Sequence, residues 1–119
     1  MSSFFKIVSS EQWEEAKITG LIPRCTADIN ADSLFVNQFD DLETVCSRFF
    51  SKFDYPVALE FSPESYSGQL EWLEPTEEKP WSEGQLKVDH LFADLVLNIY
   101  SFEVVSTTNG DQFSLQGEE

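Results

Sequence analysis

The chain has 119 residues, with 22 acidic against seven basic side chains and a formal net charge of −15. Its hydrophobic content of 41% and its eleven phenylalanines predict one folded domain with a packed core, not a disordered chain. So negative a surface repels phosphate backbones and anionic lipids, which argues against nucleic-acid binding by a basic face and against a membrane surface.

No apolar stretch reaches the roughly 20 residues that a membrane-spanning helix needs, and the N-terminus has no secretory-signal pattern. We therefore expect a cytoplasmic protein. Cys25 and Cys46 form no C-x-x-C pair, so two free thiols are expected in a reducing compartment. We expect no metal site, because zinc would require both cysteines, His90 and a carboxylate to converge.

The first predicted helix follows a short aromatic run at the N-terminus. Ser9 and Gln12 form a capping-box pattern, which predicts a helix from about Ser10 to Ile18. Gly20 follows as the stop signal.

A second capping-box pattern, Asp40 with Glu43, precedes the clearest helical periodicity in the chain. The apolar residues after it recur at intervals of three and four and predict a helix over Leu42–Phe53 with a wide aromatic stripe facing the core. The members of this stripe are Leu42, Val45, Cys46, Phe49, Phe50 and Phe53.

Strands are predicted wherever β-branched and aromatic residues form short runs. These runs are Phe4–Val8, Leu34–Val36, Tyr55–Phe61, Leu70–Pro75, Lys87–Phe92 and Leu95–Val105. Leu21–Ser33 is expected to be an irregular connection, and Thr76–Gly84 a polar segment anchored by Trp81. The strands outnumber the helices, and both helices lie in the first half, so we predict an α+β fold. Residues 1–105 form the predicted domain, and 106–119 an acidic, flexible C-terminal tail.

The acidic residues are concentrated between positions 60 and 83, where Lys79 is the only basic residue. The simplest interpretation is a solvated face that aids solubility. Two alternatives remain open: docking of a basic partner, and imitation of a nucleic-acid backbone.

Three segments together resemble the DUF952 family of small proteins. The first is Phe5–Gly20, which resembles the family's opening Y-K-I…W…A…G. The second is Asp32–Gln38 followed by the Leu42–Phe53 helix, where the family has D-G-F-I-H-L-S and a helix ending in F-F. The third is Leu70–Trp72 followed by Val88–Ala93, which resembles L-R-W-E…F-P-H-L-Y-G. The resemblance covers roughly residues 4 to 105.

The resemblance implies an ADP-ribosylation-like fold: a split, curved, mixed or antiparallel sheet with two main helices, around a cleft that relatives use to hold NAD. In that superfamily a histidine or arginine on an early strand positions the dinucleotide, and an aromatic ring stacks on the nicotinamide. The family itself has no established function.

The chain departs from the family pattern at the polar positions. Aligned without gaps, Val36 stands at the family's histidine, Gln38 at its serine and Phe92 at its tyrosine. Valine offers no hydrogen-bond donor or acceptor to a ribose or phosphate oxygen. Phenylalanine keeps the stacking face but loses the hydroxyl. Glu74 can stand for the family's acidic residue if one residue is inserted after Trp72.

His90, the only histidine of the chain, is the one candidate for a catalytic residue. A general acid or base must lie within hydrogen-bond reach of the substrate proton, and nothing in the sequence orients His90 for that task. Its neighbour Asp89 would point to the opposite face of a strand. Arg24 is the best candidate for a phosphate contact, with Lys87 behind it. The candidate cleft residues are His90, Phe92, Trp72, Val36, Gln38, Arg24 and Glu74.

The sequence leaves three functions open. The first is a catalytically silent module that binds a protein or a small molecule through a degenerate nucleotide cleft, with no cofactor. The second is a transferase or hydrolase that uses NAD or an ADP-ribosyl group. The third is an acidic mimic or inhibitor that occupies a basic protein surface. We favour the first, which is not an enzyme.

Overall fold

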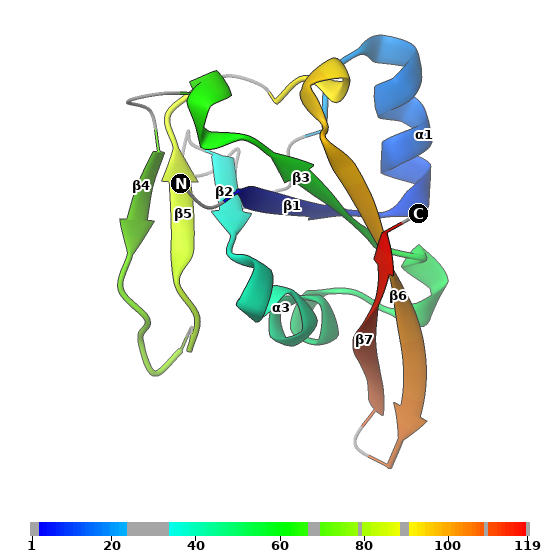
Figure 1. The fold of residues 1–119 in the computed structure, drawn as a ribbon. Helices are drawn as coiled ribbons and strands as arrows, with labels where there is room; N and C mark the ends of the chain where they lie inside the picture. The colour runs from blue at the N-terminus through cyan, green and yellow to red at the C-terminus, as the bar shows by residue number, and fades with distance from the viewer. Residues whose placement is uncertain are drawn as a thin grey trace.

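The computed structural model describes residues 3–23, 34–66, 70–78, 80–88, 91–108 and 110–118. Within these ranges it confirms the α+β class: seven antiparallel strands form one sheet, and two α-helices pack against it (Figure 1). Every strand pair is antiparallel, so a mixed sheet is excluded for the described strands. The elements are β1 (Phe4–Val8), α1 (Ser10–Thr19), β2 (Leu34–Asn37), α3 (Leu42–Phe49), β3 (Val57–Phe61), β4 (Leu70–Leu73), β5 (Glu83–Leu86), β6 (Asn98–Thr107) and β7 (Gly110–Glu118).

The strands follow the order β4-β5-β2-β1-β3-β6-β7 across the sheet. β1 pairs with β3 along its whole length but with β2 at one position, Phe5 opposite Asn37. Beside that junction the buried Lys6 donates from Nζ to the carbonyl oxygen of Phe35, at 2.8 Å. β1 and β2 therefore share the shortest backbone pairing among the described strands, and the Lys6 side chain adds a hydrogen bond there.

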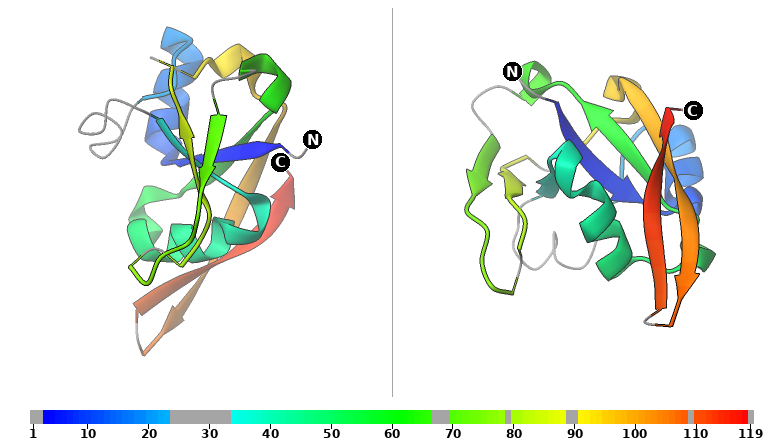
Figure 2. Two further views of the ribbon diagram at one scale, coloured as in Figure 1. Left: turned by 90° about the vertical axis from the view of Figure 1, so that its left-hand side faces the viewer. Right: turned by 60° about the horizontal axis from the view of Figure 1, so that its bottom comes forward.

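The two helices cover opposite faces of the sheet. Successive side chains of a strand point to opposite faces, and all five side chains of β1 are buried. Phe4 packs in a core with Ala16 of α1, whereas Phe5 packs in a second core with Leu42 and Cys46 of α3. The views in Figure 2 show α1 and α3 on the two sides of β1. Within the described residues, no helix is long and apolar enough to span a membrane.

The first helix confirms its prediction. Ser9 accepts a hydrogen bond from the backbone of Gln12, and the Gln12 side chain accepts one from the Ser9 backbone. Gly20 ends the helix with a φ of 83°, which glycine adopts without a steric penalty.

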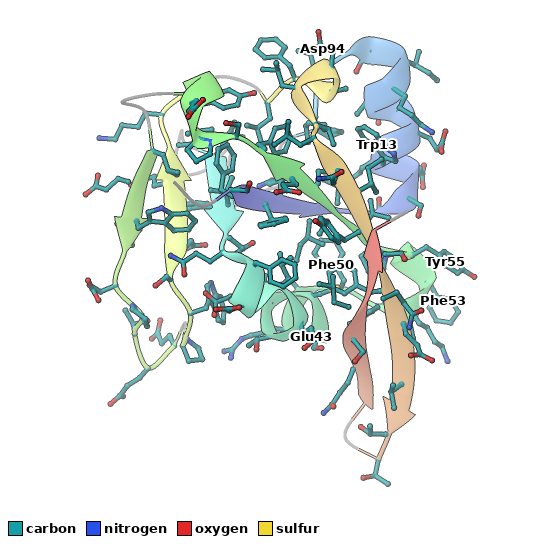
Figure 3. All side chains as sticks on the ribbon, viewed as in Figure 1. Trp13, Glu43, Phe50, Phe53, Tyr55 and Asp94 are labelled. Carbon is teal, nitrogen blue, oxygen red and sulfur yellow. The ribbon has the colours of Figure 1, made fainter. Side chains whose placement is uncertain are left out.

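The second helix is shorter than predicted. It ends at Phe49, because Phe50 is extended and a new capping box between Ser51 and Asp54 starts a separate 3-10 turn. The expected packing of the stripe is wrong in part: Phe49 is 60% exposed and Phe53 77% exposed, while Phe50 is half-buried. Figure 3 shows Phe53 and Tyr55 projecting away from the sheet.

The predicted cap of the second helix is also wrong. Asp41, not Asp40, is the N-cap residue, and its side chain makes no capping bond. The Asp41 carboxylate instead accepts a hydrogen bond from the backbone N–H of Ser82. Glu43 accepts one from the backbone of Leu115. Both carboxylates are therefore used by contacts distant in sequence.

Two strand boundaries in the second half differ from the sequence interpretation. The predicted strand at Lys87–Phe92 is wrong for the residues of that range that the structure describes. The strand lies earlier, at β5, and Phe92 forms an isolated bridge with Leu21. The last long strand begins three residues later than expected, after a 3-10 turn at Ala93–Leu95. Trp81 is buried, as its predicted role as an anchor requires.

The prediction of a flexible tail at 106–119 is wrong, because residues 110–118 form β7, which pairs with β6 as a hairpin. The overlooked signal is Asn109-Gly110, a dipeptide that favours tight hairpin turns; Gly110 has a φ of 114°. β7 is held from its other side by α3: the N–H of Phe113 donates to Ser47 Oγ, at 2.9 Å. The folded unit therefore extends beyond residue 105.

Phe113 provides a test of this assignment. It is 5% exposed in the core formed with α3, so Phe113→Ala should reduce the free energy of unfolding by about 3 kcal/mol or more. Urea denaturation measures the loss. Phe53→Ala is the matched control at a 77% exposed phenylalanine and should change stability by about 0.5 kcal/mol or less. Equal, small losses at both positions would contradict the docking of β7.

Candidate functional site

The structure brings together two residues of the predicted cleft, Val36 and Trp72, which lie on either side of β5. Both are paired with Gly84, Val36 from β2 and Trp72 from β4. A Cβ atom on Gly84 would lie 2.7 Å from Val36 Cγ2 and 2.9 Å from the ring of Trp72. Val36 is fully buried. The side chains of Val36 and Trp72 thus both pack closely against the backbone of Gly84, so that apolar side chains occupy this part of the predicted cleft.

The other predicted cleft residues that the structure describes lie elsewhere. Phe92, 43% exposed, is bridged to Leu21, and its N–H donates to the hydroxyl of Tyr66. Gln38 and Glu74 are exposed.

Two further predictions concern residues outside the described ranges. These residues are His90, the catalytic candidate, and Arg24, the phosphate candidate. Their roles therefore stay predictions.

Four of the described basic side chains make contacts within the chain. Lys6 donates to the carbonyl oxygen of Phe35, and Lys17 Nζ lies 2.9 Å from Glu14 Oε1. Arg48 stacks over Trp81 at 5.5 Å, and Lys52 lies over Phe53 at 5.4 Å.

The described part of the chain offers little for metal or thiol chemistry. It contains no group of three or more His, Cys, Asp or Glu placed to hold a metal ion. Cys46 is a buried free thiol, as expected, and burial, with a smaller effect of Asp54, raises its pKa to about 12. The thiolate that a nucleophile requires is therefore unfavourable. Cys25 lies outside the described residues.

Sequence reasoning missed a polar cluster around Glu60 on β3. Glu60 Oε1 accepts a hydrogen bond from Asn98 Nδ2 at 2.8 Å and another from the Tyr100 hydroxyl at 3.2 Å. Ser3 is a third donor. The donors lie far apart in sequence, and only the pairing of β3 with β6 brings Asn98 opposite Glu60.

Aromatic rings border this cluster. The rings of Phe5, Phe39 and Tyr100 contact one another, with centroids 5.6 to 6.0 Å apart. Phe39 is 48% exposed, and Phe5 is paired directly with Glu60, so the two side chains share a face. A carboxylate thus lies beside aromatic surface that is partly open to solvent.

The environment of Glu60 favours its charged form. Burial alone would raise the pKa of its carboxyl, but the hydrogen bonds from Ser3, Asn98 and Tyr100 together outweigh that effect and lower it. An efficient general base has a pKa near the operating pH. Glu60 is therefore suited to accepting hydrogen bonds or holding a cationic group, and poorly suited to removing a proton.

Comparison with known proteins supports the fold but not an activity. The chain matches no family model, and no curated protein matches it significantly. It is similar in fold to protein CC0527 from Caulobacter crescentus, a structural-genomics target: the crystal structure gives a TM-score of 0.74 at 17% identity over 93% of both chains. A solution NMR structure of CC0527 gives 0.70 at 18% identity, over 93% of this chain and 91% of the other. Such low identities show a shared fold alone.

The contact at Gly84 can be tested by substitution. Gly84→Ala should destabilise the protein by about 1–3 kcal/mol, because the added methyl group would overlap Val36 and the ring of Trp72. Urea denaturation measures the change. If the overlap is the cause, the Val36→Ala background should reduce the cost of Gly84→Ala. Equal costs in both backgrounds would contradict it.

The polar cluster gives a pH-dependent prediction. Tyr100→Phe removes one donor to Glu60, so the pKa of the Glu60 carboxyl should rise towards its ordinary value. A lowered folded-state pKa contributes stability above the unfolded-state pKa, which is lost as the pH falls through the folded-state value. The variant should thus be less stable near neutral pH, and this difference should shrink in acid, as the pH falls through the lowered pKa of the Glu60 carboxyl.

An NMR titration of the Glu60 carboxyl carbon, with urea denaturation at both pH values, provides the measurement. Tyr55→Phe, at a 70% exposed tyrosine, is the control and should leave the pKa of Glu60 unchanged. An unchanged pKa in Tyr100→Phe would refute the contribution of the hydroxyl.

Proposed function

We propose that the chain is a catalytically silent binding module: a diverged DUF952-like domain, with an ADP-ribosylation-like sheet and a degenerate nucleotide cleft. The observation that carries this proposal is the close packing of Val36 and Trp72 against Gly84. Where the family pattern has a histidine, this chain has a fully buried valine. The position has neither a polar group for a ribose nor space for one.

The available chemistry supports binding over catalysis. The carboxylate of Glu60 has a lowered pKa, and the thiol of Cys46 a raised one. Neither is poised for proton transfer or nucleophilic attack near neutral pH. The net charge of −15 also opposes the pyrophosphate of NAD. The expected ligand is a protein or a small molecule without that negative charge.

A nucleotide panel tests the proposal. Ligand at about 100 times its dissociation constant would stabilise the protein by about 2.7 kcal/mol, which a thermal-shift assay detects. We expect no shift with NAD or ADP-ribose below about millimolar concentration, and no NAD hydrolysis above background. Micromolar affinity by calorimetry, abolished in His90→Ala or Arg24→Ala, would favour the NAD-dependent enzyme instead.

A further inference from the structure

The two edges of the sheet differ in how they are closed. An edge strand presents unpaired backbone N–H and C=O groups, which can pair with another chain. At β7, α3 closes the edge, because Ser47 and Glu43 accept hydrogen bonds from the N–H groups of Phe113 and Leu115. Figure 3 labels Glu43 on α3, beside β7.

β4 is the other edge. It pairs with β5 on one side, and no described strand pairs with its outer side. It forms the left margin of the ribbon in Figure 1 and faces the viewer in the left panel of Figure 2. Its side chains are open as well: Trp72 is 36% exposed and Leu73 37% exposed. Exposed apolar side chains thus border a strand edge whose backbone N–H and C=O groups pair with no other described strand.

The charge around β4 identifies the kind of partner. Leu70–Glu78 contains four glutamates and no basic residue, and all four carboxylates are exposed. Two of them, Glu71 and Glu74, flank Trp72 and Leu73. A second strand on this edge would bring its side chains within about 5 Å of those of β4. Lysine or arginine there would form favourable pairs, whereas glutamate or aspartate would be repelled.

A second copy of the chain fits this edge poorly. Antiparallel pairing of two β4 strands would gather Glu71 and Glu74 of both copies in one small area, which is destabilising for like charges. It would also bring together two molecules of net charge −15 each.

We infer that β4 docks an extended, lysine- or arginine-bearing segment of a partner protein, which adds a strand to the sheet. Backbone hydrogen bonds along the edge supply affinity, and pairing with Glu71 and Glu74 selects basic sequences. The inference rests on the proposed function and specifies its surface and partner class.

The probe is a fluorescein-labelled synthetic peptide of alternating lysine and valine, followed by fluorescence anisotropy. Two control peptides separate the contributions: one replaces lysine by glutamate, and the other carries N-methyl groups that block pairing as a strand. We expect only the unmodified lysine peptide to bind, and its affinity to fall steeply between about 0.05 M and about 0.5 M salt. Hydrogen exchange at 70–73 should slow on binding.

Charge reversal provides the matched variants. Glu71→Lys with Glu74→Lys should weaken binding about tenfold or more. Glu11→Lys with Glu15→Lys makes the same charge change on α1 and should have a much smaller effect. Thermal unfolding checks that both variants fold; if the β4 variant does not, the exchange and N-methyl measurements on the wild type decide.

Several results would overturn the inference. These are absence of binding by the lysine peptide, equal binding of the N-methylated peptide, equal weakening by both charge reversals, or a dimer that protects 70–73. None of them depends on the nucleotide panel. Failure here would leave the silent binding module standing, whereas nucleotide binding would refute that module itself, and the two failures are measured in separate assays.

Discussion

The burial of β1 on both faces is the constraint on which the rest of the structure depends. Phe4 and Val8 point into the core shared with α1, and Phe5 and Ile7 into the core shared with α3. A short strand that is apolar on both faces must be covered from both sides. The helices therefore lie on opposite faces, with β2 and β3 beside β1 at the centre of the sheet.

Lys6 is the one charged side chain in that central strand, and it is buried where β1 and β2 diverge. A buried charge is tolerated only when it is paired or hydrogen-bonded, and the carbonyl oxygen of Phe35 supplies such a bond. The ammonium group of Lys6 is therefore used in a structural hydrogen bond, and it is not exposed for binding a phosphate.

Two features of the described residues support the proposed binding function. One is the carboxylate of Glu60, whose charged form is favoured beside aromatic rings, and the other is the acidic edge strand β4. Both features suit a positively charged partner, which a net charge of −15 also attracts at long range. The same negative charge disfavours NAD, the ligand that the resemblance to the DUF952 family implies.

The sequence by itself determined the α+β class, the first helix and the anchor at Trp81, because caps and hydrophobic periodicity are local signals. The end of the second helix and the start of the last strand have local signals, the Ser51–Asp54 capping box and Asn109-Gly110. The tertiary structure decided that β7 docks against α3. It also decided that Glu60 meets Asn98 and Tyr100, and that Gly84 lies between Val36 and Trp72. The contacts of Glu60 and Gly84 arise from strand pairing between residues distant in sequence. The register of that pairing depends on which side chains the two cores can bury, which is a property of the whole sheet.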